Sequence, residues 1–154
     1  MSQEEKIKEE LTEKFANLKD SIVIKRERRI FIDVSIEQWA EVFDYLVKNM
    51  KCTILSTITG LDEGNNTFAV IYHLSRDSGL MLNLRTHISR DKPSINTVTS
   101  YFPNAEMYER ELMDLLGIKV VGLAEGRRYP LPETWPQNEF PLRKDWQMKP
   151  KLTE

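Results

Sequence analysis

After Gly117 the chain loses all regular spacing of its hydrophobic residues, and this loss constrains the fold more than any other feature. Residues 118–154 show neither a helical nor a strand period, so residues 1–117 must build the hydrophobic core. Aperiodic segments of this length are uncommon in compact domains and are usually functional or disordered. Disorder is disfavoured because the segment carries large apolar side chains, namely Leu131, Trp135, Phe140, Leu142 and Trp146. We therefore interpret residues 118–154 as an extended arm that either packs back on its own domain or docks on another protein.

The length and composition of the chain predict a single domain. A chain of 154 residues with 40% hydrophobic content builds a single core. The net charge of -2 and the pI near 5.8 argue against binding to nucleic acid or to an anionic membrane. The apolar runs are too short to cross a bilayer, and the charged start MSQEEKIKEE lacks a signal-peptide core. The single cysteine, Cys52, suits a reducing compartment, so we expect a cytosolic location.

The first third of the chain predicts two helices around a hairpin. Apolar residues at helical spacing predict a first helix over residues 4–18. The stretch SIVIKRERRIFIDV then predicts two strands around a basic turn. Its cluster, Lys25 to Arg29, is interpreted as a solvated turn rather than a nucleic-acid patch, because Glu27 interrupts it. Ser35 and Gln38 have the spacing of a capping box and predict a second helix that runs through Met50.

Three strands and a last helix follow. Alternating residues over 52–61, 67–74 and 80–88, separated by EGNN and RDSG, predict an antiparallel meander. A final helix over residues 103–116 ends at Gly117, which favours a left-handed cap. The order α-β-β-α-β-β-β-α predicts an α+β fold of two layers, with a mixed, mostly antiparallel five-stranded sheet covered by helices on one face.

The residue types exclude most cofactor sites. One cysteine and two histidines cannot supply the four ligands of an iron–sulfur cluster or of a structural zinc site. His73 and His87 remain candidate metal ligands with Glu or Asp, although both lie in alternating strands where surface histidines are common. Neither GxGxxG nor GxxxxGK[ST] occurs, so a nucleotide is not expected. We expect no cofactor in this chain.

The final helix carries the candidate charged site. Its spacing places Glu109 and Glu111 on opposite margins of the apolar stripe, where carboxylates become partly buried. Arg110 points away near Asp114, and surface pairs with Glu106 and Asp114 are the simplest interpretation. General acid–base catalysis by Glu109, Glu111 or His87 stays an alternative, but no nucleophile or metal ligand set accompanies these residues.

The last third of the sequence resembles a known family. YFPNAEMYERELMDLLGIKVVGLAEGRRYPLPETWPQNEFPLRKDW is similar to the signature region of the 30 kDa subunit of respiratory NADH dehydrogenase (complex I) and of related membrane-bound, energy-converting NiFe hydrogenases. The LPETWP form resembles the hydrogenase branch more than the dehydrogenase branch. The sequence departs from the family at Met113, Leu116 and Leu123, where an aromatic residue or a histidine is common.

The resemblance implies a role without a redox centre. In that family the domain lies at the side of the peripheral arm of the complex, and its extension follows the large subunit that holds the quinone site or the NiFe centre. The implied function is a non-catalytic subunit of a hydrogenase-type complex that couples electron transfer to ion translocation on the cytoplasmic side of the membrane. The alternatives are the equivalent 30 kDa-type subunit of an NADH or ferredoxin:quinone oxidoreductase, or an adaptor of an unrelated assembly.

The resemblance also implies the partners and the contact residues. The partners would be the large subunit and a neighbouring iron–sulfur subunit, which would hold the metal centres. The arm would have few contacts of its own and would become ordered on the large subunit, with Arg127, Arg128 and Arg143 bound to the partner's carboxylates or carbonyls. The implied interface residues, none of them catalytic, are Glu109, Arg110, Glu111, Arg127, Arg128, Trp135, Pro141, Leu142, Arg143, Lys144, Asp145 and Trp146.

Overall fold

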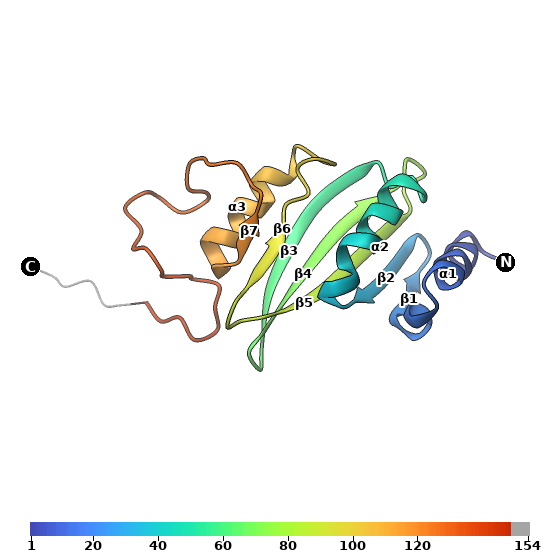
Figure 1. Cartoon of the computed structure of the whole chain (residues 1–154), viewed down its shortest axis with the longest axis horizontal. Coiled ribbons are helices and arrows are strands. Elements are labelled where there is room, and N and C mark those ends of the chain that lie inside the picture. The colour runs from blue at the N-terminus through green and yellow to red at the C-terminus, as the bar shows by residue number, and fades with distance from the viewer. Residues whose placement is uncertain (149–154) are drawn as a thin grey trace, which may run out of the picture.

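A computed structural model describes residues 1–148 (Figure 1). A five-stranded sheet has the strand order β1-β2-β5-β4-β3, in which β2 and β5 are parallel and the other neighbours antiparallel. The two-layer α+β fold predicted from the sequence is confirmed. The elements are α1 (Gln3–Lys14), the 3-10 helix η1 (Ala16–Ser21), β1 (Ile22–Arg26), β2 (Arg29–Val34), α2 (Ile36–Lys48), β3 (Ile54–Gly64), β4 (Thr67–Ser75), β5 (Met81–Ser89), β6 (Ser94–Asn96), α3 (Ala105–Leu116) and β7 (Lys119–Val121).

The sheet follows from strand alternation and turn chemistry. The predicted meander is confirmed as β3, β4 and β5, and its strands begin and end within a few residues of the expected bounds. Asn65 and Asn66 both adopt a positive φ in the turn between β3 and β4, which asparagine tolerates better than most residues. Helix α2 connects β2 to the meander, which places β2 parallel to β5.

The helices cover one face of the sheet. Trp39 and Phe43 of α2 pack on Tyr72 of β4, with ring centroids 5.2 and 5.3 Å apart. Leu112 and Leu116 of α3 belong to the same buried cluster. Figure 1 shows α1 and the arm that follows β7 at opposite ends of the molecule. The arm therefore lies beside α3, far from α1.

Gly60 allows α3 to approach β3 closely. A Cβ atom at Gly60 would lie 2.5 Å from side-chain carbons of both Leu112 and Leu116. We expect Gly60→Ala to lower the free energy of unfolding by about 1–3 kcal/mol, because the two leucines must leave their packed positions. Chemical denaturation measures this loss. An unchanged midpoint would show that α3 shifts away from β3 at no cost.

Two details of the N-terminal half differ from expectation. The first helix ends at Lys14, and residues 16–21 form the 3-10 helix η1. The capping box predicted at Ser35 is wrong: Ser35 is the N-cap but makes no side-chain hydrogen bond. The amide of Gln38 instead pairs with Asn17, at 2.5 Å for the shorter contact. Packing of η1 beside α2 thus competes with the local cap.

The basic hairpin turn is held from within the domain. Arg28 adopts a positive φ, and its backbone amide donates to the Glu4 carboxylate of α1 at 2.8 Å. This hydrogen bond lowers the pKa of Glu4. The side chains of Arg26, Glu27 and Arg28 are exposed, as expected for a solvated turn.

A short strand begins the region beyond Gly117. Gly117 adopts the predicted left-handed conformation, with φ 71°, and ends α3. Residues 119–121 then form β7, which pairs in parallel with β6. The sequence pattern did not predict this pair, because three-residue strands are too short to show alternation. From Gly122 to Met148 the chain is irregular, and we call this segment the arm.

Candidate partner-binding surface

Glu109 is a fully buried structural carboxylate. It accepts hydrogen bonds from the backbone amide of Val98 at 2.7 Å and from the hydroxyl of Thr97 at 2.6 Å. Burial raises the pKa of Glu109, although both hydrogen bonds oppose the shift. The side chain lies deeper than the margin position predicted from the sequence. Its contacts tie the segment before α3 to the helix.

Only one of the two ion pairs predicted for Arg110 on α3 is present. Arg110 donates to Glu106 at 2.8 Å, which confirms that pair. It also donates to the carbonyl of Ala124 at 2.9 Å. The predicted pair of Arg110 with Asp114 is wrong, because Asp114 turns toward the arm.

Asp114 holds the first half of the arm. This buried carboxylate accepts from Nε of Arg128 at 2.5 Å and from the backbone amide of Leu131 at 2.7 Å. Arg128 also donates to the carbonyl of Trp135 at 2.7 Å. The Asp114 carboxylate on α3 therefore holds the arm directly at Arg128 and Leu131, and Arg128 in turn holds it at Trp135.

Asp62 holds the second half of the arm. Its buried carboxylate accepts from the backbone amide of Lys144 at 2.8 Å and from Arg90 at 3.0 Å. Arg90 also forms an ion pair with Asp145. Burial alone would raise the pKa of Asp62, but the hydrogen bonds from the Lys144 and Gly64 amides and the Arg90 charge lower it.

Arg143 closes the arm against the end of α3. Its Nε donates to the carbonyl of Leu116 at 2.7 Å, a group that the end of the helix leaves free. Its guanidinium lies 4.4 Å from the ring centroid of Phe140 and 5.4 Å from that of Phe68. Burial lowers the pKa of Arg143.

The two tryptophans of the arm pack on each other. Their ring centroids are 5.7 Å apart, and Nε1 of Trp135 donates to the carbonyl of Glu139 at 2.9 Å. Trp146 directs its Nε1 toward the Glu139 carboxylate at 3.4 Å. Both indoles are half-buried within the arm itself.

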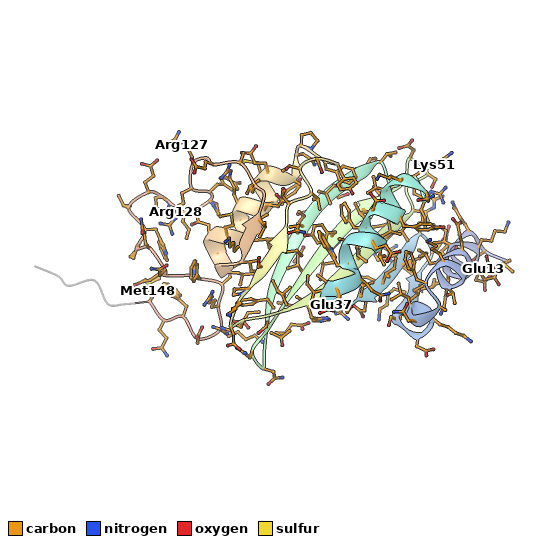
Figure 2. The ribbon with its side chains drawn as sticks, viewed as in Figure 1. Glu13, Glu37, Lys51, Arg127, Arg128 and Met148 are labelled. Carbon is orange, nitrogen blue, oxygen red and sulfur yellow. The ribbon has the colours of Figure 1, made fainter. Side chains whose placement is uncertain are left out.

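These contacts correct the expectation that the arm has few contacts of its own. Arg128 and Arg143, expected to bind a partner, instead bind Asp114 and the Leu116 carbonyl of this chain. Arg127 differs, since its side chain is 90% exposed and forms an ion pair, at 3.6 Å, with the exposed Glu133. In Figure 2, Arg127 and Arg128 lie on the arm at the end of the molecule away from Glu13. Arg127 is thus the arginine of the pair that is open to a partner.

Other predicted interface residues also keep an accessible surface. Leu142 is 54% exposed, Pro141 is half-buried, and Lys144 is exposed apart from its bonded amide. Glu111 is half-buried beside Leu142. Sequence reasoning missed Asp62 and Arg90, whose partners in the arm are more than fifty residues away along the chain.

The two histidines lie on the opposite face of the sheet from α3. His73 contacts Asn83 at 2.7 Å and Thr59 at 2.9 Å, and His87 lies 3.1 Å from Glu63. Beside them, Arg85 forms an ion pair with Asp33. The fold therefore separates His87 from Glu109 and Glu111, so these alternative acid–base candidates do not form one site.

With this geometry in place, comparison with known proteins assigns the family. Residues 32–151 match the family model described as respiratory-chain NADH dehydrogenase, 30 Kd subunit. The chain belongs to this 30 kDa subunit family. The family resemblance found in the sequence is confirmed, and the matched region begins within β2 and includes the meander, α3 and the arm.

Family members from several complexes are similar to the chain. A subunit of the F(420)H(2) dehydrogenase of Methanosarcina mazei is 33% identical over 94% of this chain and 92% of its own length. Formate hydrogenlyase subunit 5 of Escherichia coli K12 is 35% identical over 76% of this chain. The chain spans only 21% of that relative's length.

Two solved structures share the fold. A chain of the membrane-bound sulfane sulfur reductase, an archaeal respiratory membrane complex, matches with a TM-score of 0.81 at 25% identity, over 96% of this chain and 87% of its own. The trypsin-resistant fragment (1-134) of Nqo5 matches with a TM-score of 0.66 at 25% identity, over 79% of this chain and 98% of its own. The family match and both structural matches therefore agree that this chain is a complex I-related 30 kDa subunit.

Within residues 1–148, every helix is too short or too polar to cross a lipid bilayer.

Proposed function

We propose that the chain is a non-catalytic subunit of an energy-converting NiFe hydrogenase-type complex, on the cytoplasmic side of the membrane. It stabilises the large subunit through the surface formed by α3 and the arm. The metal centres belong to the large subunit and to a neighbouring iron–sulfur subunit. The electron donor and acceptor are those of the whole complex.

The observation that supports this partner is the length of the relatives. In formate hydrogenlyase subunit 5 the region similar to this chain is about a fifth of the protein, and in the C/D subunit of the NADH-quinone oxidoreductase of Shigella flexneri it is also 20%. The remainder of such a longer chain is held next to the matched domain by the covalent connection. A separate protein similar to that remainder is the natural partner for this chain.

The structure supports the same surface. Two buried carboxylates hold the arm beside α3, so a partner meets a formed surface rather than a disordered tail. Arg127 projects from this surface with its charge open to solvent. A carboxylate of the partner would pair with it in a forked contact.

A quinone-reducing dehydrogenase is the second candidate. It is favoured by the C/D subunit of Shigella flexneri, which is 38% identical over 71% of this chain, and by the fold of Nqo5. Both candidates predict a large-subunit partner. They differ in whether that partner holds nickel.

Purification of the tagged full chain from its source membranes tests the proposal. The large subunit should co-purify, with nickel and iron in the complex and neither metal in the chain produced alone. A nickel-free complex that reduces quinone would favour the dehydrogenase candidate. A chain that purifies alone, or with proteins unlike any large subunit, would contradict both.

Arg127→Glu gives a local test of the arm surface. We expect the amount of retained large subunit to fall at least several-fold, because the change places a negative charge against the partner. Lys51→Glu makes the same change at an exposed residue at the far end of the molecule (Figure 2), and should leave retention unchanged. Equal effects of the two variants would rule out a specific contact at Arg127.

A further inference from the structure

Strand β3 is an edge strand whose free side is open only in its middle. It lies last in the sheet order, and among the described residues it pairs with β4 alone. At its start, the carbonyls of Leu55 and Ser56 accept hydrogen bonds from Asn104 at 3.0 Å and Tyr108 at 2.9 Å, both from the α3 region. Near its end, Asp62 is occupied by the arm. Within residues 1–148, the backbone of 57–61 has no hydrogen-bond partner outside the β3–β4 ladder.

A groove lies along this open window. Its volume is about 240 Å³, and its walls are β3 on one side and α3 with Leu142 of the arm on the other. Leu142 is 54% exposed and Leu61 is 48% exposed, so apolar surface flanks the groove. The lining residues are Thr57 to Gly60, Glu111, Leu112, Leu115, Leu116 and Leu142.

Glu111 is the charged residue of this groove, and it lacks a partner within the described part of the chain. Helix α3 carries five charged side chains: Glu106 and Arg110 pair with each other, Glu109 binds the Val98 amide, and Asp114 binds Arg128. Glu111 makes no hydrogen bond or ion pair with any residue of 1–148, although it is half-buried. A half-buried carboxylate beside apolar walls is stabilised when a cation approaches it.

The open window of the edge carries no lysine, proline or bulge. Natural edge strands are guarded by lysine, proline or bulges, because free backbone groups recruit other strands. The sequence of β3, ILSTITGLDEG, contains neither lysine nor proline, and its irregularities lie at its two ends rather than in the open window. A strand of this kind is normally covered in the assembled state.

We propose that this groove binds an extended segment of a partner subunit, which adds to β3 as a further strand and places a lysine or arginine against Glu111. An extended segment fits because it satisfies the free backbone groups of residues 57–61, which a helix would leave unpaired. The apolar side chains on one face of that segment lie against Leu115 and Leu142. This proposal rests on the proposed function, since it assigns the segment to a subunit of the same complex.

Photo-crosslinking in the purified complex tests the geometry. A photoreactive p-benzoylphenylalanine in place of Leu142, an exposed residue of the groove wall, should crosslink to a short extended stretch of another subunit that contains lysine or arginine, as mapped by mass spectrometry. The same group in place of Glu37 on α2 should not reach that stretch. A crosslink between two copies of this chain, a crosslink to a helix, or no crosslink in an intact complex would overturn the proposal.

Charge reversal tests the role of Glu111. Glu111→Lys should reduce the retained partner at least tenfold, and exchange of the crosslinked lysine or arginine for glutamate should restore it. Glu37→Lys, an exposed glutamate on α2 labelled in Figure 2, is the matched control and should change retention less than twofold. Full retention by Glu111→Lys would overturn the assignment of Glu111. If the wild-type chain itself co-purifies with no large subunit, the proposed function fails. This outcome differs from a loss of the partner that is seen only in the Glu111→Lys variant.

Discussion

Asp114→Ala is expected to detach the arm from α3 and to lower the free energy of unfolding by about 2–4 kcal/mol. The change removes a buried carboxylate that accepts from Arg128 and from the Leu131 amide. Arg128, with its side chain only 21% exposed, loses its charge partner, and an orphaned donor near the interior carries a desolvation penalty. The arm should then move away from the domain.

Hydrogen exchange and chemical denaturation measure these two effects. The Leu131 amide should exchange slowly in the wild type and much faster in Asp114→Ala, because its acceptor is gone. Glu133→Ala is the control within the arm: its ion pair with Arg127 is exposed on both sides and should contribute less than about 0.5 kcal/mol. Equal exchange of Leu131 in the wild type and in Asp114→Ala would mean that the arm is held without Asp114.

The sheet was predictable because its signals are local. Each strand of the meander shows apolar alternation over enough residues to give a period, and each turn of the meander carries Asn or Gly where a positive φ is needed. The end of α3 was equally clear, since Gly117 is one of the few residue types that favour a left-handed cap. These features depend on neighbours in sequence.

The arm was not predictable because its contacts join distant residues through the backbone. Asp62 binds the amide of Lys144, and Arg143 binds the carbonyl of Leu116, so neither contact leaves a side-chain pattern in the sequence. Asp114 was misassigned because Arg110, four residues earlier, is a common helical partner. Arg110 instead donates to Glu106 and to the Ala124 carbonyl, and Asp114 accepts from Arg128 of the arm.

Glu109→Ala is expected to have the second large effect, a loss of about 2–4 kcal/mol in the free energy of unfolding. It leaves the amide of Val98 without an acceptor and opens a cavity under α3. Glu111→Ala, two residues away, changes a side chain without a partner among the described residues and should stay within about 0.5 kcal/mol. The contrast separates a buried structural carboxylate from one that is open to a partner.

The pH dependence of stability distinguishes Glu109 further. Burial raises the pKa of Glu109 above its ordinary value of 4.5 in the folded chain. Between that value and the raised pKa, the folded state binds more protons at this site than the unfolded state, so this group makes stability fall as the pH rises through the window. Glu109→Gln keeps an acceptor for the Val98 amide and cannot ionise, so the fall should be smaller in this variant. Denaturation from about pH 4 to about pH 8 measures the difference, and parallel curves for the wild type and Glu109→Gln would show that the pKa of Glu109 is not raised in the folded chain.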